Sequence, residues 1–193
     1  MSRGRLEAFS DGVIAILITI MVLELKVPAG TDLHALRAAM PTLGFYVLSF
    51  VMLGIYWNNH HHMLHATERI NGTVLWANLH LLFWLSLIPF MTSWMGVYWA
   101  DALPTAAYGT VLLLAGFAYW ILQMTIIRVQ GQVSRLQHAV GSDVKGKLSL
   151  VLYACAIPFA FVASWIADAV YVAVALIWLV PDRRIEAEFR EEQ

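Results

Sequence analysis

The first long apolar segment most constrains the fold, because charged residues crowd its start and none interrupts it afterwards. The stretch Arg5–Asp11, with sequence RLEAFSD, leads into an uncharged run from Gly12 to Leu23. A helix over that run would be about 18 Å long, shorter than the roughly 30 Å hydrocarbon core of a bilayer. A spanning helix must therefore extend to about 9–27, which brings Asp11 and Glu24 to the membrane edges. Charges at such depths are tolerated where they face protein or water, so we do not expect lipid on all sides of this helix.

The composition is that of an integral membrane protein. Hydrophobic residues make up 60% of the 193 residues and charged residues 13%, against roughly 45–50% and 25% in soluble domains. A formal net charge of −1 gives no indication of nucleic-acid binding. The single cysteine, Cys155, excludes a disulfide framework within one chain. Glu7 and Asp11 interrupt the N-terminal region, so we expect no cleaved signal peptide.

Six spans are predicted from the apolar runs, in one all-α domain covering residues 1–193. They lie at about 9–27, 42–65, 70–97, 104–129, 147–166 and 168–181. Pro158 predicts a kink in the fifth span, and Pro181 ends the short sixth span. Only Ala167 and Asp168 separate the last two runs, so one long broken segment, giving five spans, is the alternative.

The basic residues favour six spans over five. With six spans, ten of the twelve basic residues lie on the side of the N-terminus, as the positive-inside rule expects of a cytoplasmic face. With five spans, the three basic residues after position 181 would move to the other side. We therefore predict a multi-pass protein of the cell membrane with both termini cytoplasmic. The ten are Arg3, Arg5, Arg69, Arg128, Arg135, Lys145, Lys147, Arg183, Arg184 and Arg190, and the other two are Lys26 and Arg37.

The predicted spans hold few groups that could carry out chemistry. No carboxylate lies near mid-span, where a proton- or sodium-coupled transporter usually needs one. No nucleophile–base pair, HExxH motif or glycine-rich phosphate loop is present, which argues against an enzyme. Histidines crowd 60–65, and His61 and His65 are spaced to share a Zn²⁺ ion, but polar residues at the membrane interface explain them as well. We predict no cofactor and no bound metal.

One face of the first span carries an apolar stripe. At 100° per residue, Gly12, Ile16, Thr19, Ile20 and Leu23 share that face, and Ser10 and Asp11 point away from it. Around a symmetry axis the aliphatic residues would form rings, and rings of this kind can gate a pore by dewetting. On periodicity alone, ordinary helix-packing surface is the commoner explanation of such a stripe, because apolar residues dominate every span of a membrane protein.

The start of this span resembles the signature of a known channel family. Arg5, Phe9, Ser10 and Asp11 match the RxxxFSD pattern of the transmembrane protein 175 family of potassium-permeable channels. The place of the motif at the mouth of the first span, the six-span layout and the chain length extend the resemblance over most of the chain. A TVGYG-type potassium filter is not found in the sequence.

The resemblance implies a homotetramer in which the first span lines a central pore. Family members with one six-helix unit per chain assemble as tetramers. By resemblance, Ile16 forms the narrowest hydrophobic ring, Ile20 and Leu23 form the next layers, and Thr19 supplies a hydroxyl position implicated in selectivity. The residues that the resemblance selects are those that the helical projection groups.

The motif itself has two interpretations. Ser10 and Asp11 could bond polar groups of the second and third spans, with Trp76 and His80 as natural partners because they lie one turn apart. Alternatively, they cap the helix and complement its dipole. Arg5 could pair with Glu7 or with an acid of a neighbouring chain, or serve only as a positive-inside anchor.

The sequence therefore predicts a homotetrameric channel that conducts K⁺ through a hydrophobic constriction. At a collar of four Ile16 side chains an ion must lose part of its hydration, which costs K⁺ less than the more strongly hydrated Na⁺. The alternatives are a proton-permeable or weakly selective cation leak, a secondary transporter, or a membrane scaffold.

Overall fold

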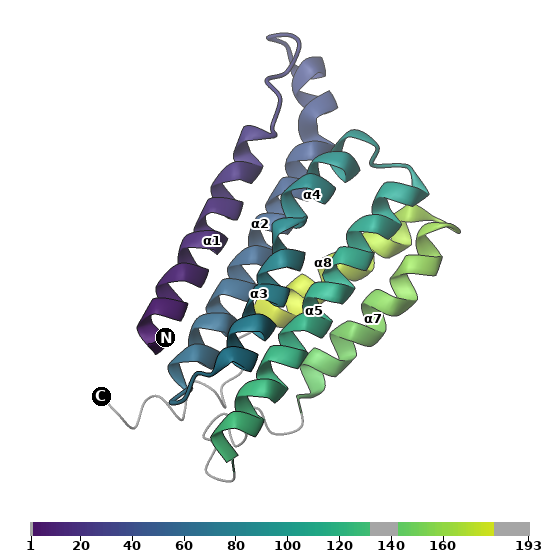
Figure 1. The fold of residues 1–193 in the computed structure, drawn as a ribbon. Coiled ribbons are helices and arrows are strands. Elements are labelled where there is room, and N and C mark those ends of the chain that lie inside the picture. The colour runs from purple at the N-terminus through teal and green to yellow at the C-terminus, as the bar shows by residue number, and fades with distance from the viewer. Residues whose placement is uncertain (1, 132–142, 180–193) are drawn as a thin grey trace.

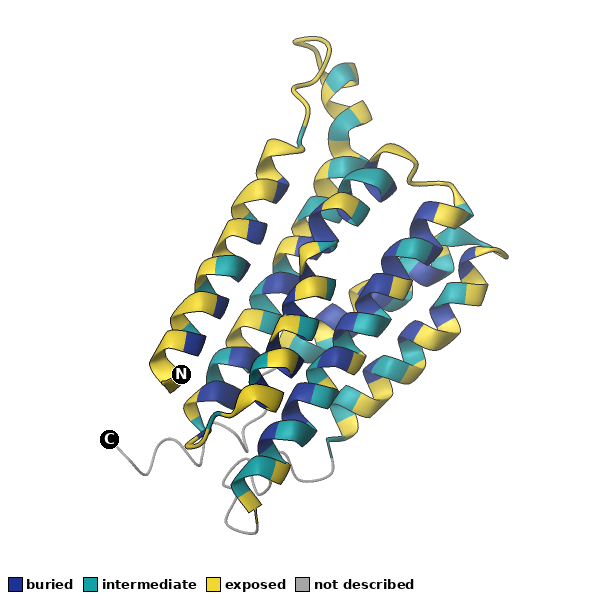
Figure 2. Cartoon of the chain, in the orientation of Figure 1, coloured by how far each residue is buried: buried dark blue, intermediate teal, exposed yellow. Residues whose placement is uncertain are grey.

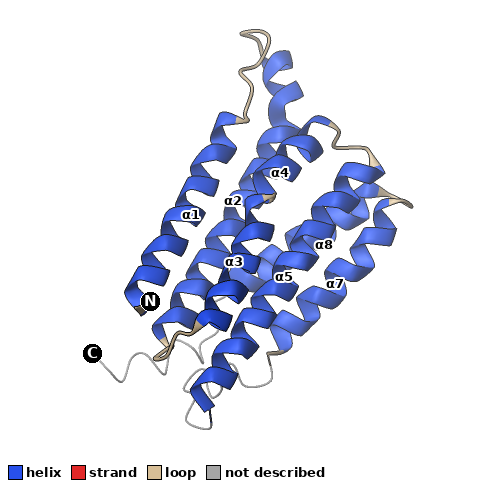
Figure 3. Ribbon diagram, viewed as in Figure 1, coloured by secondary structure: helices blue, strands red, loops and turns tan. Residues whose placement is uncertain are grey.

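Seven helices make up the part of the chain that the structure describes, which is residues 2–131 and 143–179 of a computed structural model (Figure 1). No strand occurs among these residues (Figure 3). Two of the helices, α3 and α4, follow each other with one residue between them, so the described residues form the six helical segments that the sequence predicts. The helices are α1 (Arg3–Leu23), α2 (Leu33–His65), α3 (Gly72–Ser86), α4 (Ile88–Val97), α5 (Ala102–Gln130), α7 (Val144–Ala160) and α8 (Ser164–Leu179).

Four segments are long and apolar enough to cross a bilayer. They are Arg3–Leu23, Leu33–His65, Gly72–Val97 and Ala102–Gln130, and Ser164–Leu179 is a shorter apolar helix. Four of the basic residues used to orient the chain, Arg135, Arg183, Arg184 and Arg190, lie outside the described residues.

The first two helices begin before their apolar runs, which corrects the predicted bounds. α1 starts at Arg3 instead of about residue 9, so the RLEAFSD stretch lies within its first turns. α2 starts at Leu33 instead of 42 and includes Pro41. The Asp32 carboxylate accepts a hydrogen bond from the Ala35 backbone nitrogen at 2.8 Å, which caps α2. Apolar runs indicate the length inside a membrane, whereas polar caps set where a helix begins.

Two prolines account for the other differences from the predicted spans. The span predicted at 70–97 breaks at Leu87, because Pro89 near the start of α4 has no N–H to donate into the preceding turn. The span predicted at 147–166 ends at Ala160, two residues after Pro158, in a turn where Phe161 donates to the Pro158 carbonyl at 3.2 Å. Pro158 itself lies inside α7, near its C-terminal end, and Asp168 lies inside α8.

The helices lie side by side, with α1 at one edge of the bundle (Figure 1). α1 contacts α2, α3 and α4, whereas α5 lies in the middle and contacts α3, α4, α7 and α8. The N-terminus of α1 and the C-terminal end of α2 lie at the same end of the molecule, which we call the motif end.

Buried side chains gather between the helices, and much of the outside is apolar (Figure 2). Large exposed apolar side chains occur on most helices, including Phe50, Phe83, Val151 and Val172. An apolar exterior of this extent is unfavourable in water but suits a lipid environment. The structure therefore has the surface of a membrane protein.

Candidate functional site

α1 has one face buried against the bundle and an opposite face that is exposed (Figure 2). The stripe that the helical projection grouped lies on the exposed face. Ile16 is 57% exposed, Ile20 40% and Leu23 80%, and Gly12 and Thr19 are exposed too. Within one chain nothing covers these residues. The buried face carries Leu6, Ser10, Ile14, Leu17 and Met21.

The Thr19 hydroxyl is oriented by its own helix. It donates to the Ile16 carbonyl at 2.9 Å, a bond common for Thr in helices. Its proton is therefore committed to the backbone. What Thr19 can offer a cation on the exposed face is the lone pairs of its oxygen.

A ladder of polar contacts joins the motif end of α1 to α2. Arg3 donates to the His65 carbonyl at 3.0 Å. One turn along, His61 Nδ1 lies 3.0 Å from Glu7 Oε1, and at the next turn Trp57 Nε1 donates to Asp11 Oδ1 at 3.0 Å. Each step of four residues along α1 is matched by a step of four residues back along α2, which is the register of an antiparallel helix pair.

A second, buried network joins α1, α3 and α2 through Asn78. The Asn78 amide nitrogen donates to Ser10 Oγ at 2.9 Å, and Asn78 Oδ1 lies 2.7 Å from His60 Nε2. All three side chains are fully buried. Ser10 also donates to the Leu6 carbonyl at 2.9 Å. Buried hydrogen bonds with this geometry fix the rotation of α1 about its own axis, because any turn of the helix would leave them unmade.

The partners of the motif differ from those predicted on α3. Trp76 is 75% exposed, and His80 accepts a hydrogen bond from Trp84 Nε1 at 2.9 Å instead of bonding the motif. Trp57 and Asn78 bond Asp11 and Ser10 in their place. Trp76, His80 and Trp84 do share a face of α3, but that face points away from α1. Asn78, two residues from Trp76, lies on the opposite side and meets α1.

The remaining motif residues lie on the surface of the single chain. Arg5 is exposed and has no hydrogen bond or ion pair with any residue that the structure describes. The expected alternative pairing of Arg5 with Glu7 is not made, because Glu7 contacts His61. Phe9 is exposed as well. Both face outward next to the exposed stripe.

The far end of α1 is packed more loosely. An open groove of about 540 Å³ lies between α1 and α4, lined among others by Ile20, Glu24, Ser93 and Trp94. Among the described residues, the polar link across this groove is the bond from Ser93 Oγ to Glu24 Oε2 at 3.3 Å. α1 is therefore held firmly at the motif end and only weakly at the other.

The bundle is apolar on the outside, and polar contacts hold its first helix, α1, at one rotation while the opposite face of α1 stays exposed. These features define the class of multi-span helical membrane proteins. Comparison with known proteins defines the class more closely. The model of the family described as endosomal/lysosomal potassium channel TMEM175 matches residues 5–89. A potassium channel of Chryseobacterium sp. (strain P1-3) is 50% identical over 191 residues, which is 99% of this chain and 100% of that one.

A solved structure and a human protein add to this finding. The crystal structure of a lysosomal potassium-selective channel TMEM175 homolog from Chamaesiphon minutus has a TM-score of 0.81 and 26% identity, and the match covers 92% of this chain and 96% of that one. The endosomal/lysosomal proton channel TMEM175 of Homo sapiens is 34% identical over 96 residues, 43% of this chain and 19% of that protein. The chain belongs to the TMEM175 family. It is a cation channel protein of a membrane and not an enzyme.

Proposed function

We propose that four copies of this chain assemble around a central pore lined by α1 and conduct K⁺ passively across the cell membrane, with both termini in the cytoplasm. One observation carries the proposal: the exposed face of α1 is an apolar stripe that lies opposite the face fixed to the bundle. The name of the Chryseobacterium relative, a potassium channel that aligns over its whole length, supports the choice of ion.

The constriction in this proposal is a ring of Ile16 side chains, followed by rings of Ile20 and Leu23. An ion passing an apolar ring sheds part of its hydration shell, and the free-energy cost of this dehydration is lower for K⁺ than for Na⁺. Selectivity from this effect alone is modest. The lone pairs of four Thr19 hydroxyls, one turn from Ile16, would replace some of the lost water and favour K⁺ further.

The polar contacts of the motif have a positioning role in this mechanism. The Ser10–Asn78–His60 network and the bond from Trp57 to Asp11 hold α1 at one rotation. A rotation of about 100° would replace Ile16 at the constriction by a neighbouring residue. The motif therefore acts on conduction through the orientation of the pore helix, without touching the ion.

Ion flux through the purified protein in liposomes tests the pore. Under K⁺ and then Na⁺ gradients, we expect wild type to pass K⁺ in preference to Na⁺, and Ile16→Asn to raise the flux and reduce the preference. Val22→Asn is the matched control, because Val22 is also exposed but lies about 120° around α1 from Ile16. Equal flux in wild type and Ile16→Asn would remove Ile16 from the pore, and the same change in both variants would point to nonspecific loosening.

A proton-permeable channel is the second candidate, since a vertebrate relative is named a proton channel. The same liposomes, loaded with a pH-sensitive dye, distinguish the two. A flux that collapses a pH gradient without a K⁺ preference would favour the proton channel. Flux that saturates and requires a second solute would favour a secondary transporter. Mass measurement of the detergent-solubilised protein tests the homotetramer.

A further inference from the structure

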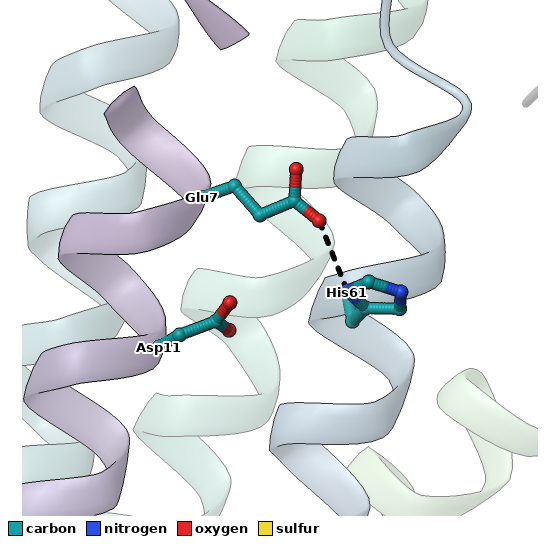
Figure 4. Close-up of side chains that lie close together, drawn as sticks. All are labelled: Glu7, Asp11 and His61. Atoms are coloured by element: carbon teal, nitrogen blue, oxygen red, sulfur yellow. Dashed lines mark ion pairs between the residues drawn. The ribbon is translucent and has the colours of Figure 1, made fainter. Parts of the chain in front are cut away.

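Three possible metal ligands from two helices gather at the motif end (Figure 4). Glu7 and Asp11 lie one turn apart on α1, and His61 faces them from α2. One ligand atom from each of the three lies within 4.8 Å of the other two. All three side chains are half-buried, so they are reachable from solvent at the end of the bundle.

The charges in this cluster are unbalanced. Two carboxylates four residues apart on one helix face repel each other. The nearest arginines do not neutralise them, because Arg3 donates to the His65 carbonyl and Arg5 makes no hydrogen bond or ion pair with the residues that the structure describes. Trp57 donates one hydrogen bond to Asp11, but the Trp57 side chain carries no charge that could neutralise the carboxylate. A histidine that binds a metal is neutral, so the two carboxylates leave the site with an excess of two negative charges, which a divalent cation would cancel.

We propose that Glu7, Asp11 and His61 form a binding site for a divalent transition metal of the Zn²⁺ type, which bridges the pore helix to α2. One imidazole and two carboxylates match the three-ligand sets that hold Zn²⁺ with a fourth position open to water. Ligand atoms about 2.0–2.2 Å from a tetrahedral metal lie about 3.3–3.6 Å apart. The 3.0 Å between His61 Nδ1 and Glu7 Oε1 is slightly shorter than this range, and small rotations of the flexible acidic side chains would adjust it and bring in the remaining ligand.

The surroundings hold the ligands in position. Trp57 Nε1 donates to Asp11 Oδ1 at 3.0 Å, and the second carboxylate oxygen could then serve as the metal ligand. The His61 ring is stacked between Trp57 and His65, with ring centroids 6.2 Å and 6.1 Å away. Such outer contacts set ligand orientation and raise metal affinity. The nitrogen ligand selects against Mg²⁺ and Ca²⁺, which prefer oxygen.

From the sequence alone no bound metal was predicted, and the one pair that could have shared an ion was His61 and His65 on α2. In the structure the acids beside His61 come from α1, 54 and 50 residues away in the chain. If α1 lines the pore, as the proposed function has it, the metal would tie the pore helix to α2 and lower ion flux when added on the motif side. Binding of the metal itself does not depend on conduction.

The first experiment measures binding without flux. The full-length protein in detergent is titrated with Zn²⁺ by calorimetry and with Co²⁺ by visible absorption, which reports tetrahedral coordination. We expect one ion per chain, unaffected by excess Mg²⁺. Loss of outer partners alone costs about 10–100-fold in affinity, so Glu7→Gln and His61→Asn should each weaken binding at least about 100-fold. Glu7 and His61 are both half-buried, so the two variants should fold, and their size-exclusion profiles check this.

Two histidine variants serve as controls and can overturn the proposal. His34 is exposed near the start of α2, at the other end of that helix, so His34→Asn should keep Zn²⁺ affinity within about threefold of wild type. His65→Asn removes only an outer contact of His61, so it should weaken binding by about 10-fold, less than the ligand variants do. Binding that survives Glu7→Gln but is lost in His65→Asn would move the site to the α2 histidines and overturn the proposal. Absence of binding to the folded wild type would also overturn it. Neither result bears on whether K⁺ flows, so failure here is distinguishable from failure of the channel proposal.

Discussion

α1 and α5 are both apolar helices long enough to cross a membrane, yet they are held in the bundle in different ways. α5 lies in the middle, and twelve of its 29 residues are buried, most of them apolar or small. α1 lies at the edge, with five buried residues out of 21, and its hydrogen bonds to other helices cluster at the motif end. α5 is thus fixed by close packing along its length, and α1 by polar contacts near one end.

The difference shows what each helix is suited for. Close packing in lipid comes from small residues that let helices approach, and it leaves less of the helix surface exposed. A helix held by a few directional bonds instead keeps a defined rotation while most of its surface stays available. An exposed apolar face with a fixed direction is what assembly around an axis requires, so α1 fits the pore and α5 the scaffold.

The largest expected effect comes from Gly109→Ala in α5. A methyl group there would overlap the hydroxyl of Tyr171 on α8, which donates to the Thr105 carbonyl at 3.0 Å. Overpacking of this kind costs about 1–3 kcal/mol, because neither the backbone nor the ring can move freely. We expect a clear fall in the melting temperature of the detergent-solubilised protein, followed by tryptophan fluorescence.

A double variant identifies the cause. Tyr171→Phe removes the hydroxyl, so Gly109→Ala should be less harmful in the Tyr171→Phe background than in wild type. Equal costs in both backgrounds would mean that the glycine is needed for another reason. No stability change at all would show that α5 is packed less closely than the structure has it, and the contrast with α1 would fail.

A smaller loss of stability and a larger loss of function are expected of Asn78→Leu. The substitution removes the bridge from Ser10 to His60 and leaves His60 Nε2 without its partner. Polar bonds between membrane helices are worth about 0.6–2 kcal/mol. The melting temperature should therefore fall less than in Gly109→Ala, while K⁺ flux in liposomes falls strongly because α1 loses its fixed rotation.

Asn78→Gln provides the comparison, since it keeps the amide but displaces it by one methylene. Partial recovery of flux in that variant would attribute the loss to the hydrogen bonds. Full activity of Asn78→Leu would reduce the network to a packing element and weaken the case for α1 as a helix of defined orientation.

Local properties of a helix can be predicted from its sequence, whereas its contacts with other helices cannot. The faces of α1 depend only on the rise and twist of a helix, so Ile16, Thr19, Ile20 and Leu23 could be grouped without a structure. The partners of the motif depend on the register between helices, which no spacing within one helix reveals. Trp76 and His80 do share a face of α3, but Asn78 on the opposite side meets Ser10. For the same reason the carboxylates beside His61 could not be foreseen.

The smallest effect on the fold is expected of Thr19→Val. This variant separates the contacts that fix α1 in the bundle from the proposed role of its exposed face in conduction. Thr19 is exposed, and its one hydrogen bond is to the Ile16 carbonyl of its own helix. The loss should cost less than about 0.5 kcal/mol, as for most exposed substitutions, so the melting temperature should match wild type. K⁺ over Na⁺ preference in liposomes should nevertheless fall, because four hydroxyl oxygens next to the Ile16 ring would be replaced by methyl groups. Thr19→Ser keeps the oxygen and should retain the preference. If Thr19→Val and Thr19→Ser select K⁺ as well as wild type, the apolar collar alone sets the selectivity, and the Thr19 oxygen has no part in it.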